Sequence, residues 1–392
     1  MRTVSVLGAT GSIGRRALEL IAAFPDQFRV GGLAARGGNL AVLVEQVRTH
    51  RPQAVALLDP RAVDRLAREL GQPRPELLAG PGGLATLAAQ VPADIVLSAL
   101  VGGAGLVPTL AAIRAGRSVA LANKEPLVMA GALMTAAARA HGTRLLPVDS
   151  EHSAIFQCLA GASPREVRRL VLTASGGPFR GFSAARLEAV TVSEALRHPT
   201  WRMGTKITID SASLMNKGLE ILEAHWLFGT PLERIDVVVH PQSIVHSMVE
   251  FVDRSVLAQL GMPDMGIPIL YALSYPERLP CPAPALDLVQ LGTLTFEAPD
   301  PVTFPCLALA RQAGAAGGAA PLVLNAANEV LVAGFLAERC GFMDVPRVIA
   351  EALDAHAHAA VPDLETCLAL DAEVRRWTEG ALVSSSTGLA RA

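Results

Sequence analysis

The stretch Val4-Ser5-Val6-Leu7-Gly8-Ala9-Thr10-Gly11-Ser12-Ile13-Gly14 decides the fold. Its apolar beginning, Val4 to Leu7, predicts a buried strand, and apolar residues then recur at helical spacing from Ile13 to Ala23. Glycines between a strand and a helix let the backbone turn tightly and approach a pyrophosphate, whose charge would meet the unpaired amides of the helix. The spacing is G-x-x-G-x-x-G rather than G-x-G-x-x-G, so a purely structural turn is the alternative. We interpret the motif as a dinucleotide-binding loop.

The alternation of strand and helix continues outward from this loop through residues 1–149. Ala- and Leu-rich segments of helical periodicity separate short β-branched runs, which is typical of a parallel sheet covered by helices. The predicted strands are Val4–Leu7, Arg29–Leu33, Ala54–Leu58, Ile95–Ala99, Ser118–Ala122 and Arg144–Val148. We therefore predict an α/β protein whose N-terminal domain is Rossmann-like and binds its ligand at the carboxyl ends of the strands.

The character of the sequence changes after residue 150. Leu170–Thr173 and Lys206–Asp210 are predicted strands, and the Gly-, Ser- and Pro-rich segment between them is a candidate mobile loop. Ile235–Phe251 and Ser255–Leu260 are predicted to form a hairpin whose apolar face a second copy of the chain would cover. The predicted domains are a dinucleotide-binding domain (1–149), a central α+β catalytic domain (150–275), a linker (276–305) and a small C-terminal helical bundle (306–392).

Composition excludes several classes of protein. The 392 residues include 34 Lys and Arg against 36 Asp and Glu, and this net charge of −2 argues against binding to nucleic acid or to an anionic membrane. Hydrophobic residues make up 51% and charged residues 18%, so the chain has enough apolar surface to fold. Ile95–Ile113 carries no charge, but its glycines and Pro108 favour a strand, a glycine loop and a buried helix over a membrane span.

The cysteines and the N-terminal sequence bear on the compartment. The five cysteines are scattered and include no C-x-x-C pair, which favours a reducing environment over a disulfide or zinc-thiolate scaffold. The N-terminus lacks the charged and apolar regions of a secretory signal peptide. We expect a cytoplasmic protein.

The segment after the second predicted strand bears on the choice of nicotinamide cofactor. Ala34-Ala35-Arg36-Gly37-Gly38-Asn39 offers no carboxylate to a ribose 2′-hydroxyl, whereas Arg36 is able to pair with a 2′-phosphate. This pattern favours NADP(H) over NAD(H). The alternative is that Arg36 is a solvated loop cation.

Carboxylates gather near predicted strand and helix ends. Asp149 and Glu151 follow the strand Arg144–Val148, and Glu220 shares one helical face with Glu223. If Asp149, Glu151 and Glu220 converge, unit charges about 4 Å apart repel by about 4 kcal/mol at an effective dielectric of about 20. A divalent cation would offset this repulsion, and all-oxygen ligands favour Mg²⁺ or Mn²⁺ over zinc. Helix caps and exposed helix acids are the alternative.

Polar side chains surround these acids in an otherwise apolar chain. Ser175, Ser211, Asn216 and Lys217 are suited to a phosphate monoester, with Lys217 supplying the charge. Turn and cap roles would suit the same residue types. His198 lies on the candidate mobile loop, where a histidine is able to cover an anionic substrate, although lone histidines are more often structural.

Taken in order, these segments resemble the 1-deoxy-D-xylulose 5-phosphate reductoisomerase family of the non-mevalonate isoprenoid pathway. The matching segments are GATGSIG (8–14), LANKE (121–125), LPVDSEH (146–152), SGGPFR (175–180), HPTW (198–201), DSASLMNKGLE (210–220), HPQSIVH (240–246) and NAANE (325–329). They span nearly the whole chain, and chance would have to reproduce both the motifs and their spacing.

The resemblance implies roles for individual residues. The implied metal ligands are Asp149, Glu151 and Glu220, and these three with Lys124 form the implied catalytic set. The implied substrate contacts are Lys124, Ser150, Glu151, Ser175, His198, Ser211, Asn216, Lys217 and Glu220. The implied NADPH contacts are Thr10, Gly11, Ser12, Ile13, Arg36, Gly37, Asn39, Asn123, Glu125 and Gly204. Trp201 and Met203 match a flexible loop that closes over the substrate in the family.

Three positions depart from the family pattern. Pro126 stands where serine is usual, which is compatible with the first turn of a helix. The loop from Arg36 to Asn39 is one residue longer than in well-known members. Asp253-Arg254 replaces the common Asp-Gly of the hairpin turn, which predicts a different turn type.

The implied reaction is the rearrangement and reduction of 1-deoxy-D-xylulose 5-phosphate to 2-C-methyl-D-erythritol 4-phosphate, with NADPH and Mg²⁺ or Mn²⁺. The metal would polarise the carbonyl during a retro-aldol and aldol sequence, and Lys124 would stabilise the oxyanion or assist proton transfer. A plain NADP-dependent dehydrogenase and a non-catalytic NADPH-binding sensor are the rival hypotheses. We expect a homodimer acting on a sugar phosphate, with no nucleic-acid or membrane partner.

Overall fold

The chain forms two compact units. The computed structural model describes residues 1–361 and 363–389, so Pro362 and positions 390–392, which belong to the predicted C-terminal domain, lie outside the described residues. The first unit comprises Met1–Pro126, Met134–Ser153 and Asp264–Pro284. The second comprises Leu127–Leu133, Ala154–Pro263 and the chain from Ala285 onward. The unit boundaries fall within helices α6 (Glu125–Ala140) and α7 (Ser150–Cys158), among other places.

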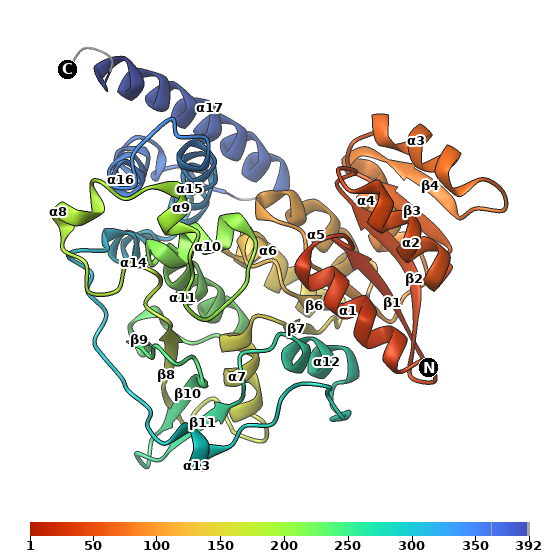
Figure 1. Ribbon diagram of the computed structural model, residues 1–392, viewed down its shortest axis with the longest axis horizontal. Coiled ribbons are helices and arrows are strands. Elements are labelled where there is room, and N and C mark those ends of the chain that lie inside the picture. Colours follow the sequence, from red (N-terminus) through yellow and green to blue (C-terminus); the bar gives the residue numbers. More distant parts are fainter. Residues whose placement is uncertain (362, 390–392) are drawn as a thin grey trace. The chain divides into compact units, whose positions relative to one another are not determined.

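The first unit is built on a seven-stranded parallel sheet with the order β4-β3-β2-β1-β5-β6-β7 (Figure 1). Its strands are β1 (Arg2–Leu7), β2 (Phe28–Ala35), β3 (Ala54–Leu57), β4 (Glu76–Ala79), β5 (Ile95–Ser98), β6 (Ser118–Leu121) and β7 (Leu145–Pro147). Its further helices are α1 (Ser12–Ala23), α2 (Leu40–His50), α3 (Arg61–Leu70), α4 (Gly80–Gln90), α5 (Leu106–Arg114) and α12 (Gly266–Ser274), with a 3-10 turn at Gly102–Gly105. The α/β prediction for this part of the chain is confirmed.

The six predicted N-terminal strands are all present, and one strand was missed. β3 and β5 are buried along their whole length because helices cover both faces of the sheet, which explains their continuous apolar sequence. β4 lies at the sheet edge and is only half-buried, so its short sequence carries little of the apolar signal that marks the others.

The charge-free stretch Ile95–Ile113 folds within the first unit. It divides into β5, the 3-10 turn and α5, as its glycines and proline predicted. Most of its apolar residues are buried, with Ile113 and Leu97 at 0% exposure, although Val101 in the glycine turn is 70% exposed. Among the described residues, every helix falls short of the length and apolar character needed to cross a membrane.

The second unit contains a four-stranded sheet with the order β11-β10-β8-β9. The strands are β8 (Val167–Ala174), β9 (Ile235–Val239), β10 (Val245–Phe251) and β11 (Val256–Leu260). The predicted hairpin exists between β10 and β11, and Arg254 in its turn has a φ of +76°, the left-handed conformation that glycine usually supplies. The prediction of one strand over Ile235–Phe251 is wrong, because a loop at 240–244 separates β9, which pairs parallel to β8, from β10.

The prediction of a strand at Lys206–Asp210 is also wrong. This segment lies in helix α10 (Thr205–Ala212), although Ile207-Thr208-Ile209 is rich in β-branched residues. The hydroxyl of Thr208 donates to the carbonyl of Gly204, one turn earlier, and Thr208, Ile209 and Ala212 are buried on the inner face of the helix. Burial of this helical stripe overrides the local β preference.

Helices make up most of the remainder of the second unit. They are α8 (Ala184–Leu187), α9 (Val192–Ala195), α11 (Met215–Phe228), α13 (Leu288–Leu291), α14 (Pro305–Ala316), α15 (Ala320–Leu336), α16 (Asp344–His356) and α17 (Leu364–Leu389), with a 3-10 turn at Leu232–Arg234. α15 is buried along nearly its whole length and packs against α14, α16 and α17. The helical C-terminal region is therefore confirmed, and the chain breaks between α14 and α15, where Gly317 and Gly318 have positive φ.

Candidate active site

The glycine loop lies at the point where the strand order of the first unit reverses. β1 sits between β2 and β5, and the loop after β1 contacts the end of β5 so closely that a Cβ on Gly8 would lie 2.2 Å from the carbonyl oxygen of Ala99. Gly11 precedes α1 without a side-chain cap, and both Gly11 and Ser12 are exposed. Amides at an uncapped helix start are suited to a pyrophosphate, and such a reversal point is where open parallel sheets bind ligands.

The loop after β2 contains two residues that shape its backbone and one exposed cation that is accessible to a ligand. Gly37 has a φ of +107° and packs on Ala62, and the side-chain oxygen of Asn39 accepts a hydrogen bond from the amide of Val42 at the start of α2. Arg36 is exposed at the end of β2, and the described residues offer its guanidinium no hydrogen-bond acceptor. Arg36 is thus free to receive a charged ligand, while Gly37 and Asn39 shape the loop.

Asn123, Lys124 and Glu125 follow β6, and Asp149 follows the neighbouring strand β7. The Asn123 amide donates to the carbonyl of Gly102 at 3.2 Å and also to Glu125. Lys124 and Asp149 form an ion pair of 2.5 Å between Nζ and Oδ2, and the Lys124 side chain is only 6% exposed. Parallel strands end at the same edge of a sheet, so two residues distant in sequence meet there.

Asp149 and Glu151 form a pair of carboxylates at the start of α7. One oxygen of each lies within 4.8 Å of the other, and the Ser150 hydroxyl donates to Glu151 at 2.5 Å. Two neighbouring carboxylates with an all-oxygen donor set fit a divalent cation such as Mg²⁺ or Mn²⁺.

The second unit contributes the residues at the start of α11. Glu220 is 0% exposed, and its two oxygens accept from the Asn216 amide and from the Lys217 ammonium. Leu214, which precedes the helix, has a φ of +60°, so the chain turns sharply between α10 and α11. This corner places Ser211 at the end of one helix and Asn216 and Lys217 in the first turn of the next.

The candidate mobile loop is held on the same unit by His198. The Nδ1 atom of His198 accepts from the amides of Trp201 at 2.9 Å and Thr200 at 3.2 Å, so Nε2 carries the proton and donates to the Ser175 hydroxyl at 2.8 Å. Burial lowers the pKa of His198 to about 4, so the ring is neutral near pH 7. The amide of Gly177 also donates to the Ser175 hydroxyl at 3.2 Å, and Gly177 packs closely on α10, where a Cβ would lie 2.7 Å from the carbonyl oxygen of Ser211.

The predicted residues therefore form two sets. The structure brings together Asn123, Lys124, Glu125, Asp149, Ser150 and Glu151 in the first unit, and Ser175, His198, Ser211, Asn216, Lys217 and Glu220 in the second. Thr10, Gly11, Ser12 and Ile13 lie in the loop at the start of α1. Gly204 precedes α10 and is exposed, and its contact with a cofactor stays a prediction.

Sequence reasoning assigned no role to two buried polar residues beside the second set. Asp210 and Asn328 are 1% and 0% exposed, and the Asn328 amide donates to Asp210 at 2.8 Å. Both residues stand in matched motifs, DSASLMNKGLE and NAANE, but no local pattern shows that the two segments touch. The signal that was available is the pair of asparagines, Asn325 and Asn328, within the largely apolar helix α15.

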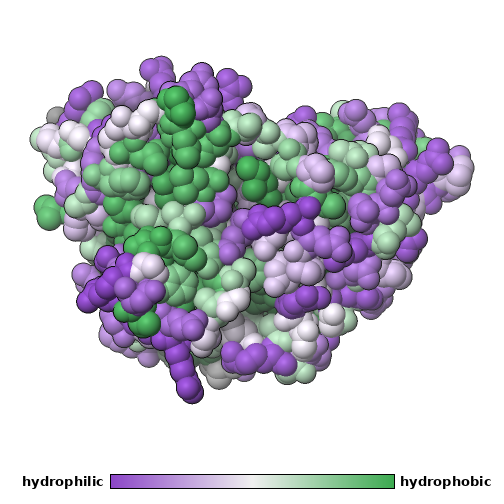
Figure 2. Space-filling view, turned by 90° about the horizontal axis from the view of Figure 1, so that it is seen from below, coloured by the Kyte–Doolittle hydropathy of each residue, from purple (hydrophilic) through white to green (hydrophobic). Residues whose placement is uncertain are grey.

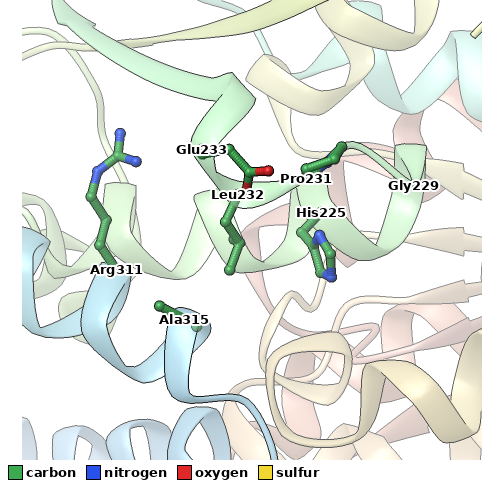
Figure 3. A pocket seen from close by; sticks show the side chains of 8 residues that line it. His225, Gly229, Pro231, Leu232, Glu233, Arg311 and Ala315 are labelled. Carbon is green, nitrogen blue, oxygen red and sulfur yellow. The ribbon is translucent and has the colours of Figure 1, made fainter. Parts of the chain in front are cut away.

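A separate pocket opens at the other end of α11 (Figure 3). Its volume is about 600 Å³, and its lining residues are His225, Gly229, Pro231, Leu232, Glu233, Arg311, Gly314 and Ala315. None of the predicted site residues lines it. The Nδ1 atom of His225 is engaged by the carbonyl of Thr230, and the Arg311 guanidinium donates to the carbonyl of Ile235.

Comparison with known proteins decides the family. Models of the 1-deoxy-D-xylulose 5-phosphate reductoisomerase family match residues 4–131, and models of its C-terminal domains match residues 145–228 and 260–377. The chain is 54% identical over 380 residues to 1-deoxy-D-xylulose 5-phosphate reductoisomerase of Synechococcus sp. (strain JA-2-3B'a(2-13)), covering 96% of this chain and 97% of the relative. The chain belongs to this reductoisomerase family.

Solved structures agree with this family membership. A 1-deoxy-D-xylulose 5-phosphate reductoisomerase from Zymomonas mobilis in complex with NADPH is 46% identical, with a TM-score of 0.91 over 97% of this chain and 99% of that one. A DOX-P reductoisomerase in complex with NADPH, fosmidomycin and magnesium is 40% identical, with a TM-score of 0.93 over 97% and 98% of the two chains. The reductoisomerase fold thus extends over nearly the whole chain.

The neutral state of His198 predicts a pH dependence of the loop. An open loop exposes a histidine with a pKa near 6.5, whereas the held loop resists protonation down to a pKa of about 4. The stability that this difference gives the held loop is therefore complete above about pH 6.5 and is lost as the pH falls toward 4. Hydrogen-exchange protection of residues 196–204, corrected for intrinsic rates, is expected to fall between pH 7.5 and pH 5.

Two variants check this assignment. His198→Gln can donate to Ser175 and accept from the backbone without titrating, so its loop protection is expected to be independent of pH. His141→Gln alters an exposed histidine of α6's C-terminal end and is expected to leave the wild-type pH dependence unchanged. A pH dependence that persists in His198→Gln would contradict the assignment.

Proposed function

We propose that this chain converts 1-deoxy-D-xylulose 5-phosphate to 2-C-methyl-D-erythritol 4-phosphate, and that each of the two sets of residues described above takes part in binding or catalysis. As a member of the reductoisomerase family, the protein is an NADP-dependent oxidoreductase of isoprenoid synthesis. The observation that carries the residue assignment is the pairing of every buried site carboxylate with a lysine or an amide in its own unit. The domain boundaries at 149, 275 and 305 are part of this proposal.

NADPH is proposed to bind along the carboxyl edge of the parallel sheet. Its pyrophosphate would lie on Thr10, Gly11, Ser12 and Ile13, where the helix start is uncapped. Arg36 would pair with the 2′-phosphate, helped by the shape that Gly37 and Asn39 give the loop. Asn123, Glu125 and Gly204 would contact the remainder of the cofactor. The related Zymomonas mobilis enzyme, solved with NADPH, supports this placement.

A divalent cation is proposed to bind Asp149, Glu151 and Glu220. The proximity of the carboxylate oxygens of the first two acids and the burial of the third support this ligand set, as does the related enzyme solved with magnesium. When bound, NADPH supplies a hydride and the cation polarises the substrate carbonyl. The protein's part is to hold both against the substrate in a fixed geometry.

Substrate recognition is proposed to divide between the phosphate and the reacting end. Ser175, Ser211, Asn216 and Lys217 would bind the phosphate, and Lys217 is the buried charge among them. Ser150 and Lys124 would contact the reacting end, where Lys124 keeps its proton on Nζ beside Asp149 and stabilises developing negative charge. His198 would cover the substrate, and Trp201 and Met203 of the same loop would exclude water.

The carboxylate assignment predicts a strict metal requirement. With NADPH and 1-deoxy-D-xylulose 5-phosphate, loss of absorbance at the nicotinamide band is expected with Mg²⁺ or Mn²⁺ and is expected to stop when a chelator is added. Glu220→Gln removes a proposed ligand charge and is expected to lower kcat/KM by about a hundredfold or more. Glu233→Gln, an exposed glutamate outside the site, is expected to behave as wild type.

Three outcomes of this assay would point elsewhere. Turnover that survives the chelator would favour a plain dehydrogenase, which has no use for clustered carboxylates. Tight NADPH binding without turnover under any metal would favour a sensor. Full activity of folded Glu220→Gln would remove that residue from the ligand set while leaving the reaction itself in place.

Arg36 is expected to set the cofactor preference. Arg36→Ala removes the pairing with a 2′-phosphate, so KM for NADPH is expected to rise by about tenfold to a hundredfold while KM for NADH stays the same. Arg68→Ala, an exposed arginine of α3, serves as the matched control and is expected to change neither constant. An equal loss toward both cofactors would show that Arg36 acts on the loop rather than on the phosphate.

We further propose that the protein is a homodimer in the reducing environment of the cytoplasm. One face of the four-stranded sheet presents a row of Ala258, Met248 and Val171 across three strands, none of them fully buried. Val256 of the edge strand β11 is 51% exposed. Figure 2 views the molecule from the side on which β10 and β11 lie, and apolar side chains gather over part of that side. All five cysteines are free, which supports a reducing compartment.

Charge on the sheet face is expected to separate the dimer. The wild-type protein is expected to sediment with twice the 40.9 kDa of one chain, and Met248→Glu as a folded monomer because two copies cannot bury that charge. Val302→Glu alters a side chain that is 86% exposed outside the sheet and is expected to remain dimeric. A dimer that persists in Met248→Glu would place the interface on another surface.

A further inference from the structure

Lysine is nearly absent from this chain. Of its 34 Lys and Arg residues, 31 are arginine, and the lysines stand only at positions 124, 206 and 217. Lys124 and Lys217 belong to the proposed active site, and each forms an ion pair with a site carboxylate. Lys206 forms a third pair of the same kind, with Asp210, and no step of the proposed reaction uses it. Because arginine serves every other cationic position, a compact ammonium at 206 points to a specific requirement.

Asp210 is a buried carboxylate with both oxygens engaged. Its Oδ2 receives the Lys206 ammonium at 2.7 Å from one turn earlier in α10, and its Oδ1 receives the Asn328 amide at 2.8 Å from α15. The side chains of Asp210 and Lys206 are 2% and 16% exposed. The carboxylate therefore joins the start of α10, its end, and the middle of a buried neighbouring helix.

Burial of this ion pair is not needed to pack α10 on α15. Removing two charges from water costs several kcal/mol, and apolar residues of the same volume often stabilise a fold as well or better. What the buried pair adds is direction, because the carboxylate that it holds also accepts from Asn328, and that hydrogen bond forms in only one register of the two helices. The Lys206–Asp210–Asn328 contact is thus better explained by the position it enforces than by its contribution to stability.

The contact of Asp210 with Lys206 and Asn328 positions both ends of α10, and each end adjoins a different part of the proposed site. Lys206 is the second residue of α10, two positions after Gly204, where the loop carrying Trp201 and Met203 ends. At the other end, Ser211 follows Asp210, and the Ser213 hydroxyl donates to the Asp210 carbonyl and accepts from the amide of Met215. These bonds lead through the sharp turn into the first turn of α11, which holds Asn216 and Lys217.

The partner helix α15 is itself anchored by an ion pair. The Asn325 amide donates to Glu329 at 2.8 Å, and Glu329 pairs with Arg375 of α17 at 2.9 Å. Asn328 therefore projects from a helix that is also tied to α17. The proposed reaction assigns no role to the NAANE segment (325–329), and this arrangement gives it a structural one.

We infer that Lys206 and Asp210 form a positioning pair, which with Asn328 sets α10 so that the mobile loop and the phosphate-binding corner are aligned together. The inference rests on the proposed function of that corner. Neither residue touches the substrate in this scheme. Their effect is exerted through Ser211, Asn216 and Lys217 on the phosphate and through Gly204 on the loop.

The test is Asp210→Asn, which keeps an acceptor for Asn328 but removes the charge that holds Lys206. KM for 1-deoxy-D-xylulose 5-phosphate is expected to rise about tenfold, while KM for NADPH and kcat change by less than about threefold. Lys206→Arg, which preserves charge but not the compact ammonium, is expected to raise the same KM, and the double variant is expected to be no worse than Asp210→Asn because the two act as one pair.

Asp371→Asn is the matched control. It breaks another i, i+4 ion pair at 2.7 Å, Arg375 with Asp371 in α17, and is expected to lower the melting temperature without changing KM for the sugar phosphate. The inference is overturned if Asp210→Asn leaves that KM unchanged, or if it lowers kcat and raises both KM values together with the melting-temperature loss seen in the control. If Asp210→Asn does not fold, the same measurements are made on Lys206→Gln. An inactive wild type would overturn the proposed function instead, and substrate binding by tryptophan fluorescence would then decide the pair's role.

Discussion

The pairing of buried carboxylates with lysine is the interaction on which the rest of this structure depends. A carboxylate removed from water requires a neighbouring positive charge or several hydrogen-bond donors. Lys124 meets Asp149 after two adjacent strands, Lys217 meets Glu220 within the first turns of α11, and Lys206 meets Asp210 along α10. The three lysines thus mark the places where the fold keeps polar chemistry inside an apolar frame.

The parallel sheet explains why the first half of the site lies where it does. In such a sheet all strands end at one edge, so the residues after β1, β2, β6 and β7 share that edge although more than a hundred positions separate them. The reversal of strand order beside β1 requires the Gly8 loop to contact the end of β5, where a side chain would collide with Ala99. The close packing of this loop on the end of β5 therefore explains both why residue 8 is glycine and why the ligand-binding loop lies at this edge of the sheet.

Local sequence patterns predicted elements well where burial and periodicity agree. The strands of the first unit are apolar because both faces are covered. Lys206–Asp210 was mistaken for a strand because its β-branched residues obey a strand preference, whereas the buried contacts of Asp210 and Ile209 require a helix. Ile235–Phe251 was taken as one strand although Pro241, which the interior of a central strand does not accommodate, marks the loop at 240–244.

The sequence by itself determined the family, the dinucleotide-binding loop and the identities of the proposed ligands, because motifs such as LPVDSEH and DSASLMNKGLE are contiguous and their spacing is visible in one dimension. Only the tertiary structure decided which residues meet. The ion pair between Lys124 and Asp149, the protonation of His198 and the contact of Asp210 with Asn328 all depend on burial and on approach between distant segments. Burial and contacts between distant segments exist only in the folded chain, because the sequence of one local segment does not show which other segment will pack on it and exclude water.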